Sequence, residues 1–448
     1  MASWNRTTTS LKSKSSITQA NTISVVRTTL AAVLLFVVSA CGESNGRGDL
    51  EITPPIAVST GADLLVKSGF EAIDGQRVGL VVNHTATSGG RHLLDLVHEA
   101  ENVQLAALFG PEHGIRGDED AGAHIEDGID DVTGVPVYSL YGSNRRPTAE
   151  MLEGVDVLVF DIQDVGARFY TFIYTMGLSM QSAAEAGIPF VVLDRPNPLG
   201  GRRIEGFVRD SVLVSFVSLY PIPVRHGLTV GELAKMVQGE EWLPGLENLD
   251  LRVIEMEGWN RDMYWPETGL DWVPTSPNIP TFETALVYAG TCFFEATTAS
   301  EGRGTSSPFL TVGAPWLDAT ALVENLEKWE VAGVEFAAGR TTPVSIPGAS
   351  TNPKLEDVPI QTLNITVTEP DSVRAVSLGL DLVARFYDAA PDSVKDSFFN
   401  ERWLRLLSGS AQTLDLLKGG MDQAAFEWKW EEEIEAFAQL RKSYLLYD

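Results

Sequence analysis

The fold is indicated most clearly by ten residues, Leu108-Phe109-Gly110-Pro111-Glu112-His113-Gly114-Ile115-Arg116-Gly117. An apolar run, Val103 to Phe109, stops at a glycine and a proline, and a carboxylate and an imidazole then follow side by side. We interpret this pattern as a buried strand that delivers Glu112 and His113 onto a loop at its carboxyl end. The alternative is an ordinary tight turn with two solvated side chains.

Three other apolar runs end in the same way. They are Val78 to Val82, Val155 to Phe160 and Phe190 to Leu193, and they lack the polar-apolar alternation of half-exposed strands. The segments between the runs have helical spacing, with shared faces formed by Leu93, Leu94, Val97 and His98 and by Met176, Met180, Ala183 and Ala184. Strands that alternate with helices predict βαβ units and a Rossmann-like, mostly parallel sheet.

Polar residues follow each of these strand-like runs. Ligands of parallel sheets bind outside the carboxyl ends of the strands, so we expect these residues to converge on one edge. They are Asn83, Asp161, Asp164, Arg168, Tyr170, Asp194, Arg195 and Asn197. Two structural alternatives stay open: Asp194 as a helix N-cap, and an ion pair of Asp161 or Asp164 with Arg168.

The middle of the chain offers more candidate residues. A helix is predicted from Val230 to Val237, with Thr229 as its N-cap and Glu232 three residues later. His226 lies at the mouth of this helix, either as part of the cap region or as a substrate contact. The tryptophans of the next segment fit packing anchors or the aromatic wall of a sugar-binding cleft, and they are Trp259, Trp265 and Trp272.

The pattern of predicted helices and strands changes at about Pro308. Helices are predicted at 319–329, 371–387 and 423–444, and short strands at 331–336 and 360–367. We therefore expect an α/β protein with a Rossmann-like domain over residues 58–307 and a smaller α+β domain over 308–448. The active site would lie in the cleft between the two. No G-x-G-x-x-G and no phosphate-binding loop supports a nucleotide cofactor.

The amino terminus has the pattern of an export signal. Residues 1–41 combine a basic, Ser/Thr-rich leader with a short apolar run and the sequence Val38-Ser39-Ala40-Cys41. This ending resembles a bacterial lipobox, which predicts lipidation of Cys41, a polar tether over residues 42–57 and a place in the cell envelope. The second cysteine, Cys292, lies in an apolar run and is expected to be a buried thiol.

The charge of the chain narrows the range of partners. The net charge is −28, and residues 1–40 hold four basic residues and no acid. The remaining 29 basic and 61 acidic residues give a net charge of −32. Because nucleic-acid binding depends on basic contacts to phosphate, such a surface makes nucleic-acid function a poor fit.

Taken together, the motifs resemble the exo-β-N-acetylmuramidase family (glycoside hydrolase family 171, NamZ-type), long known as a domain of unknown function. The resemblance runs from about Val78 to the end of the chain, with Leu228 and Ile279 where methionine is more usual. The motifs that carry it are G-P-E-H-G-I-R-G at 110–117, S-L-Y-G at 139–142, D-I-Q-D-V-G-A-R-F-Y-T at 161–171, L-D-R-P-N-P-L-G-G at 193–201, H-G-L-T-x-G-E-L-A at 226–234, S-P-N-I-P at 276–280 and S-E-G-R-G-T at 300–305.

This resemblance implies release of N-acetylmuramic acid from the non-reducing end of peptidoglycan fragments, without a metal or a nucleotide. It makes Glu112 the best candidate for the essential acid, and His113 would orient it or bind a sugar hydroxyl. Asp161 or Asp164 would be the second carboxylate, unless the acetamido group of the sugar supplies the nucleophile.

Further residues are assigned to substrate binding. Guanidinium groups form bidentate pairs with carboxylates, so three arginines are candidates to hold the lactyl carboxylate, namely Arg168, Arg195 and Arg303. Amides suit hydroxyl and acetamido groups, as at Asn83, Asn197 and Asn278. The remaining expected contacts are Tyr170, His226, Ser276 and Glu301.

Two other functions compete with this interpretation. A lipid-anchored sugar-binding protein would have the same two-domain pattern but would not turn its ligand over. A metal-dependent hydrolase could use His113, His226, Asp161 and Asp164 as ligands, although no H-x-H or H-E-x-x-H spacing supports it.

Overall fold

The computed structural model describes residues 57–111, 114–116, 127–142 and 144–448. All of them belong to one compact unit that extends from Pro54 to Asp448. The predicted signal peptide, the predicted lipidation site Cys41 and nearly all of the predicted tether lie outside the described residues, as do Glu112 and His113. In the described part, no helix is long and apolar enough to cross a membrane.

The main sheet is built as the strand-helix alternation predicts. Neighbouring strands run parallel except for β5 and β6, and the order is β5-β6-β4-β1-β7-β8-β9. If β5 is set aside and the other six strands are numbered in chain order, their order in the sheet is 3-2-1-4-5-6. This is the strand order of a doubly wound Rossmann sheet. The bounds, in sheet order, are Gly128–Ile129, Pro136–Ser139, Gln104–Gly110, Arg77–Val82, Val157–Asp161, Phe190–Leu193 and Leu251–Ile254.

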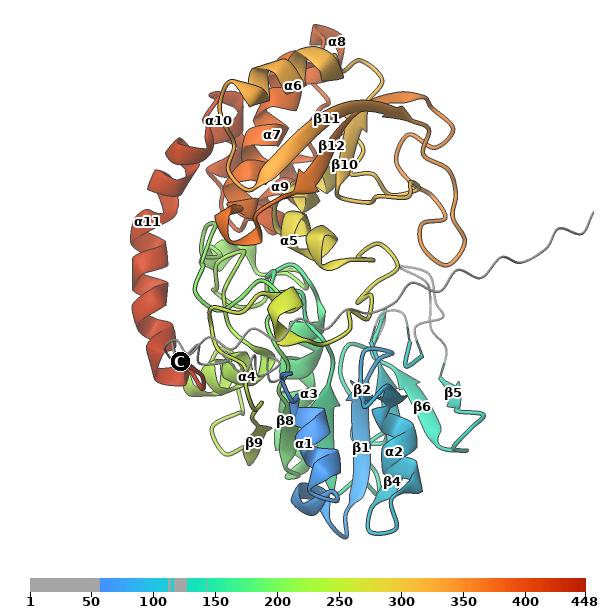
Figure 1. Cartoon of the computed structure of the whole chain (residues 1–448). Helices are drawn as coiled ribbons and strands as arrows, with labels where there is room; N and C mark the ends of the chain where they lie inside the picture. The colour runs from blue at the N-terminus through green and yellow to red at the C-terminus, as the bar shows by residue number, and fades with distance from the viewer. Residues whose placement is uncertain (1–56, 112–113, 117–126, 143) are drawn as a thin grey trace, which may run out of the picture. The chain divides into compact units, whose positions relative to one another are not determined.

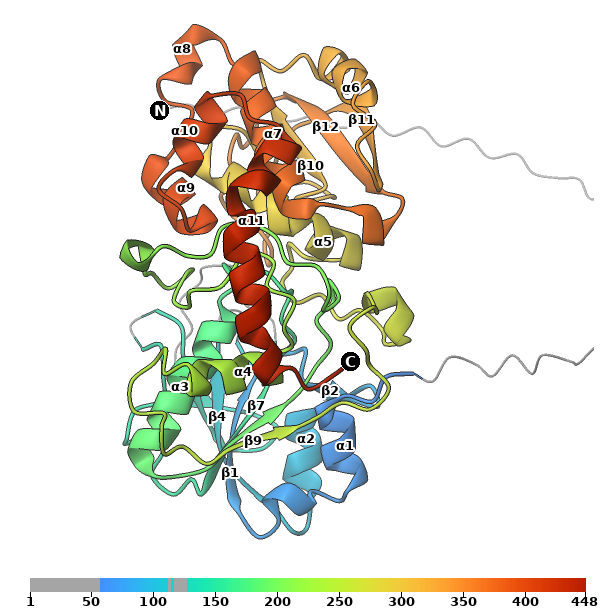
Figure 2. The same ribbon diagram turned by 90° about the vertical axis from the view of Figure 1, so that its left-hand side faces the viewer.

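Helices cover both faces of this sheet, which explains the continuous apolar runs of its central strands. Helices α1 (Gly61–Lys67) and α2 (Leu93–Glu99) pack with one set of strand side chains, and α3 (Phe172–Ala186) and α4 (Val230–Gly239) pack with the other. Figure 2 shows the two pairs on opposite sides of the strands. His98 is an exception to the predicted apolar face of α2, because its side chain is exposed at the end of the helix.

The second half of the chain forms a three-stranded antiparallel sheet with helices packed on it (Figure 1). The strand order is β10-β12-β11, with bounds Thr311–Ala314, Ile360–Val367 and Val334–Thr341. The helices are α5 (Phe282–Thr291), α6 (Ala319–Glu327), α7 (Ala375–Ala389), α8 (Asp392–Lys395), α9 (Glu401–Ser408), α10 (Thr413–Lys418) and α11 (Gln423–Leu440). A small hairpin of β2 (Thr87–Ser88) and β3 (Arg91–His92) follows β1.

Three predicted helices are shorter than expected. The helix predicted at 319–329 ends at Glu327. The helix predicted from residue 371 begins at Ala375, because a separate 3-10 turn occupies Pro370–Ser372. The helix predicted to residue 444 ends at Leu440, and its last turn tightens into a 3-10 segment, Arg441–Tyr444. Tightening of this kind is common at helix ends.

Helix α5 belongs with the second half of the chain, although the predicted boundary at residues 307 and 308 follows it. Gly290 of α5 and Gly379 of α7 meet so closely that a Cβ atom on either would overlap the backbone of the other helix. Helix α11 then runs along both halves (Figures 1 and 2), with Phe426 and Trp430 in the C-terminal core and Phe437 in the core over α3 and α4.

Candidate functional site

The switch point of the sheet lies between β1 and β7, where the strand order reverses direction. Val82 pairs with Asp161 at the carboxyl ends of these strands, so Asn83 emerges beside the loop that follows β7. The Asn83 Oδ1 atom accepts hydrogen bonds from the N–H and the hydroxyl of Thr85, at 2.9 and 2.6 Å. The Thr85 hydroxyl accepts from the N–H of Gln163 at 2.9 Å. These bonds fix the two loops against each other at the position where doubly wound sheets bind ligands.

Asn83 and Gln163 each have one buried polar atom without a hydrogen-bond partner among the described residues. Asn83 is fully buried, and its Nδ2 atom has no hydrogen-bond partner among the described residues. The Oε1 atom of buried Gln163 also lacks one, while its Nε2 atom donates to the carbonyls of Asp164 and Pro196, both at 2.8 Å. Unpaired buried polar atoms are costly, and they mark places where a ligand can bind.

Asp161 pairs with Arg195 and not with Arg168. The Arg195 Nε and Nη2 atoms lie 2.5 and 2.8 Å from the two carboxylate oxygens of Asp161, and Nη2 also donates to the Thr87 carbonyl at 3.0 Å. Both side chains are buried, with exposed fractions of 0% and 5%. Burial lowers the pKa of Arg195, but the Asp161 carboxylate outweighs this and raises it. Both oxygens of Asp161 are therefore occupied by the Arg195 guanidinium.

Asp164 has a different environment from Asp161. Its Oδ2 atom accepts from the N–H of Gly166 at 2.6 Å and lies 3.9 Å from Nε2 of His226, while Oδ1 has no partner among the described residues. Burial raises the pKa of this carboxyl to about 7, against the hydrogen bonds from Gly166 and Val165. Asp164 can therefore hold or release a proton near neutral pH.

His226 faces Asp164 as a neutral ring. Its Nδ1 atom accepts from the N–H of Leu228 at 3.2 Å, so the hydrogen of the neutral ring is on Nε2, the atom that faces Asp164. Burial, helped by the charges of Arg441 and Arg168, lowers the pKa of His226 to about 3. At 3.9 Å the two side chains form no hydrogen bond, and the Nε2 atom of His226 has no partner among the described residues. A neutral donor thus lies near a carboxyl whose pKa is about 7.

Arg168 does not face a ligand position. The side chain is fully buried, and its guanidinium donates to the carbonyls of Phe207, Ile222 and Leu407 at 2.7–2.8 Å. It thereby joins three distant segments of backbone, and we assign it a structural role in place of the expected one. Asn197 is engaged in the same manner, since its Nδ2 donates to the Leu228 carbonyl and its Oδ1 accepts from the N–H of Leu199, both at 2.9 Å.

Asp194 serves as the cap of a helix. Its carboxylate accepts from the hydroxyl of Thr229 at 2.7 Å and the N–H of Gly231 at 2.8 Å, at the start of α4. It also accepts from the hydroxyl of Tyr447 at 2.6 Å. Thr229 and Glu232 form the predicted capping box on the same helix. These contacts favour the capping interpretation of Asp194 over a role in the site.

The segment from Pro274 to Asn278 connects the sheet edge to the second half of the chain. The Pro274 carbonyl lies 2.6 Å from Nε2 of His84, and the Thr275 hydroxyl accepts from the Tyr170 hydroxyl at 2.9 Å. The Asn278 Nδ2 atom donates to the Ala349 carbonyl at 2.8 Å. The hydroxyl of Ser276 accepts from the N–H of Asn278 at 3.3 Å. Ser276 and Asn278 therefore lie on a bridge whose first residues contact the loops after β1 and β7.

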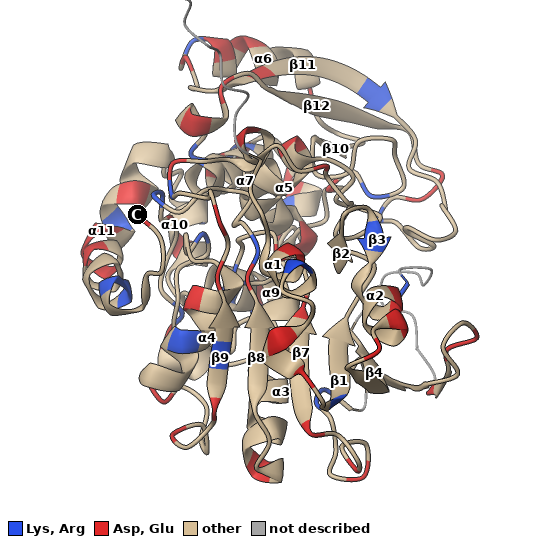
Figure 3. Ribbon diagram, turned by 60° about the horizontal axis from the view of Figure 1, so that its bottom comes forward, with Lys and Arg blue, Asp and Glu red and all other residues tan. Residues whose placement is uncertain are grey.

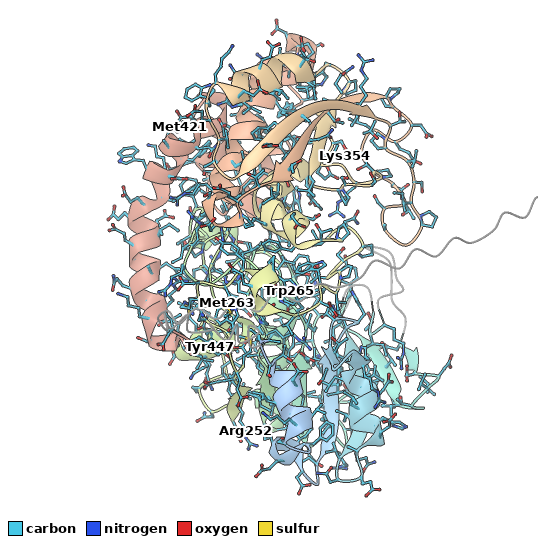
Figure 4. All side chains as sticks on the ribbon, viewed as in Figure 1. Arg252, Met263, Trp265, Lys354, Met421 and Tyr447 are labelled. Carbon is cyan, nitrogen blue, oxygen red and sulfur yellow. The ribbon has the colours of Figure 1, made fainter. Side chains whose placement is uncertain are left out.

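A second charged group lies in the C-terminal half. Arg303 binds Glu295 at 2.8 Å and lies 3.6 Å from Glu301, and Lys354 binds Glu301 at 2.8 Å. Lys354, labelled in Figure 4, also donates to the carbonyls of Phe294, Thr297 and Ala299. The Arg303 side chain keeps 26% of its area exposed, in contrast to Arg168 and Arg195. Lys354 was not predicted, since an isolated lysine on a loop belongs to no recognisable sequence pattern.

The predicted tryptophan wall is a packing feature in this fold. Trp259 and Trp265 are buried, and Trp265 meets Trp272 edge to face with ring centroids 5.1 Å apart. Trp259 meets Tyr447 in the same way, also at 5.1 Å. Figure 4 labels Trp265 and Tyr447 in the middle of the chain's fold. Trp259 and Trp265 are therefore packing anchors in the core, which is the commoner of the two alternatives.

Comparison with known proteins agrees with this architecture. The family model described as exo-β-N-acetylmuramidase NamZ, N-terminal, matches residues 78–283, and the corresponding C-terminal model matches residues 286–447. The chain belongs to the NamZ family. Both halves of the fold are covered, and the two family models meet within α5, between residues 283 and 286.

Relatives of this NamZ-family chain are similar over nearly its whole length. The peptidoglycan β-N-acetylmuramidase NamZ of Bacillus subtilis (strain 168) is 41% identical over 391 residues, which are 87% of this chain and 91% of the relative. Two DUF1343 family proteins from Bacteroides fragilis NCTC 9343 have known crystal structures. One is 36% identical with a TM-score of 0.80, over 88% of this chain and 100% of the other. The second is 32% identical with a TM-score of 0.73, over 87% and 99%.

The two central residues of the predicted NamZ site, Glu112 and His113, lie outside the described residues, but their flanks are described. Pro111 and Gly114 are buried just beyond β4, and the N–H of Gly114 donates to the Pro111 carbonyl at 3.0 Å. His92 connects this segment to the switch point, since its Nε2 atom lies 3.0 Å from the Asn83 carbonyl and 3.2 Å from the Ile115 carbonyl. This positioning role of His92 was not predicted.

No metal cluster is present among the described residues of this NamZ-family chain, where no three His, Cys, Asp or Glu side chains lie close enough to share an ion. Of the ligands that the metal-dependent alternative would use, His226 lies 3.9 Å from Asp164, whereas Asp161 is bound to Arg195. The catalytic roles of Glu112, His113, Asp161 and Asp164 stay predictions at this point.

Proposed function

We propose that this protein is an exo-acting glycoside hydrolase that releases N-acetylmuramic acid from the non-reducing end of peptidoglycan fragments. The observation that carries the proposal is the 41% identity to the B. subtilis peptidoglycan β-N-acetylmuramidase across 87% of this chain. The polar groups at the switch point between β1 and β7 support it, since they converge where an α/β sheet binds its ligand.

In this proposal, Glu112 is the general acid. It would protonate the leaving glycosidic oxygen, while the oxygen of a water molecule forms the new bond to the anomeric carbon. Glu112 follows β4, the strand next to β1, so its loop starts beside Asn83. His113 would orient Glu112 or bind a sugar hydroxyl.

For the second carboxyl group we favour Asp164 over Asp161. Both oxygens of Asp161 are occupied by Arg195, which suits a positioning role. Asp164 has an oxygen without a partner among the described residues and a pKa of about 7. A group with this pKa can accept a proton from water and return it at neutral pH.

For the lactyl carboxylate we favour Arg303 among the three predicted arginines. Its side chain is 26% exposed, whereas Arg168 is fully buried and Arg195 is 5% exposed. Glu295 and Glu301 hold it in place, and Lys354 adds a second cation to the group. The unpaired Nδ2 atom of Asn83 is suited to donate to a sugar hydroxyl or to the acetamido oxygen.

The test is hydrolysis of a chromogenic β-N-acetylmuramide by residues 42–448. We expect wild type to release the chromophore and Glu112→Gln to lose about a hundredfold or more of the rate, the usual loss for a general acid. Glu101→Gln is the matched control, since Glu101 is exposed near the amino end of the same strand. Binding of the muramide without its hydrolysis would contradict the proposal and favour a sugar-binding protein, and equal rates in the two Glu112 forms would remove Glu112 from its role.

We also propose that the mature protein is anchored to a bacterial membrane through a lipid on Cys41. The support is the sequence Val38-Ser39-Ala40-Cys41 after a short apolar run. In cells that express the full chain, we expect wild type in the membrane fraction with an acylated amino-terminal peptide, and Cys41→Ser without acylation. An unmodified Cys41 in the mature protein, found by mass spectrometry, would refute the anchor.

A further inference from the structure

An arginine-lined cavity lies away from the switch point. Its volume is about 640 Å³, and its walls come from residues 199–204, 261–264 and 371–374 and from the end of α11. Five arginines line it, against two aspartates, Asp262 and Asp371. The arginines are Arg202, Arg203, Arg261, Arg374 and Arg441. Acidic residues outnumber basic ones by 61 to 33 in the chain, so five arginines around one cavity are not expected from the composition alone. Figure 3 shows the charged residues of both signs on the ribbon.

Ion pairs neutralise only part of this charge. Arg202 binds Asp262 at 2.6 Å, and Arg261 binds the buried Glu232 at 2.6 Å. Within the described part of the chain, the other three arginines take part in no ion pair, and these are Arg203, Arg374 and Arg441. The cavity therefore keeps an excess of positive charge in its walls.

Arg441 shows that this charge is built into the fold. Arg441 is 7% exposed. In the described part of the chain, its guanidinium donates to three carbonyls and to no carboxylate, and these are the carbonyls of His226, Gly227 and Arg202. Burial, with the nearby charges of Arg261 and Arg202, lowers its pKa to about 10, so it stays a cation at neutral pH. One cation at the end of α11 is usual because of the helix dipole, but the dipole does not account for four more.

We propose that this cavity binds a small organic anion that carries at least two phosphate or carboxylate groups. Guanidinium groups pair bidentately with both kinds of oxyanion, and three of them here have no carboxylate partner among the described residues. The volume lies within the range of about 300–1,000 Å³ that small-molecule sites occupy. The residues that line the cavity include neither Asn83, Asp164 nor His226, so the cavity is separate from the proposed muramide site, although Arg441 donates to the His226 carbonyl.

The test is isothermal titration of residues 42–448 with pyrophosphate and, separately, with citrate, at matched ionic strength. We expect saturable binding with one anion per chain, and the tighter anion identifies the ligand as a phosphate or a carboxylate. The double variant Arg203→Gln/Arg374→Gln should bind about tenfold more weakly or worse, as expected for lost charge-assisted hydrogen bonds. Arg402→Gln/Arg405→Gln is the matched control, because it removes the same two charges from exposed positions of α9.

Two results would overturn the proposal. One is the absence of saturable binding of either anion at millimolar concentration, and the other is equal affinity in wild type and the double variant. If the double variant fails to fold, Arg374→Gln alone serves, because Arg374 is exposed. The titration measures no hydrolysis, so its failure would leave the proposed muramidase function unaffected.

Discussion

The substitution Asp164→Asn tests the raised pKa of Asp164 through the free energy of unfolding, without an activity measurement. Asparagine has nearly the same shape as a protonated aspartic acid and keeps an oxygen for the N–H of Gly166. Its amide can take the place of the Oδ1 atom, which has no partner among the described residues. The substitution therefore removes the titration of a buried carboxyl and leaves its surroundings unchanged.

The expected magnitude follows from the pKa of Asp164. Burial raises it from 3.8 to about 7. A carboxyl with a raised pKa stabilises the fold fully below its unfolded pKa, and this contribution is lost as the pH rises through the folded pKa. About three pKa units correspond to an upper limit of about 4 kcal/mol. Since Asp164→Asn does not titrate, it should exceed wild type in stability above pH 7 and approach it near pH 4.

The assay is urea unfolding of wild type and Asp164→Asn at pH 5 and pH 8. The gain of the variant over wild type should be about 3 kcal/mol larger at pH 8, since two of the three pKa units lie between these values. Asp156→Asn is the control, because the Arg77 guanidinium beside the exposed Asp156 lowers its pKa to about 2, outside this window. A stability difference for Asp164→Asn that is the same at both pH values would refute the reasoning.

Three further outcomes are expected. Asp161→Asn leaves the buried Arg195 without its partner and should lower the free energy of unfolding by about 3–5 kcal/mol in urea titrations; a change under 1 kcal/mol would contradict a buried pair. Asp194→Ala removes the acceptor of four donors, so its thermal midpoint should fall and the amide protons at the start of α4 should exchange faster; unchanged exchange would argue against capping. Dialysis against a chelator should leave muramide hydrolysis unchanged, and a loss restored by added metal would favour the metal-dependent alternative.

The central sheet was predictable because its strands are buried on both faces. Runs such as Phe190 to Leu193 can only be central strands of a covered sheet, and the structure has β8 at those residues. The outer strands β6 and β9 were not predicted, since they are only partly buried and so lack the continuous apolar run of β8, which has the same length. The packing of α5 on α7 could not be predicted, because it depends on the close approach of Gly290 and Gly379, which are far apart in the sequence.

The candidate site was predictable as a region but not as a set of partners. The rule for parallel sheets places Asn83 and Asp161 on one edge, and the register of β1 and β7 confirms that they are neighbours. Sequence spacing could not decide whether Asp161 would meet Arg168 or Arg195. That choice depends on where the chain turns after β8, and the turn sends Arg195 back to Asp161 while Arg168 enters the interior.

The last residues of the chain complete a helix that forms in its first half. Tyr447 donates to Asp194, the N–H of Leu446 donates to Glu232, and the carbonyl of Asp448 accepts from the N–H of Arg261. A chimera that joins the first half of one relative to the second half of another at residue 284 would therefore have two mismatched regions. One is the junction itself, and the other is the contact of the last residues with the start of α4. A recombinant that also transplants the segment from α11 onward with the first half should express better than one that swaps the halves alone.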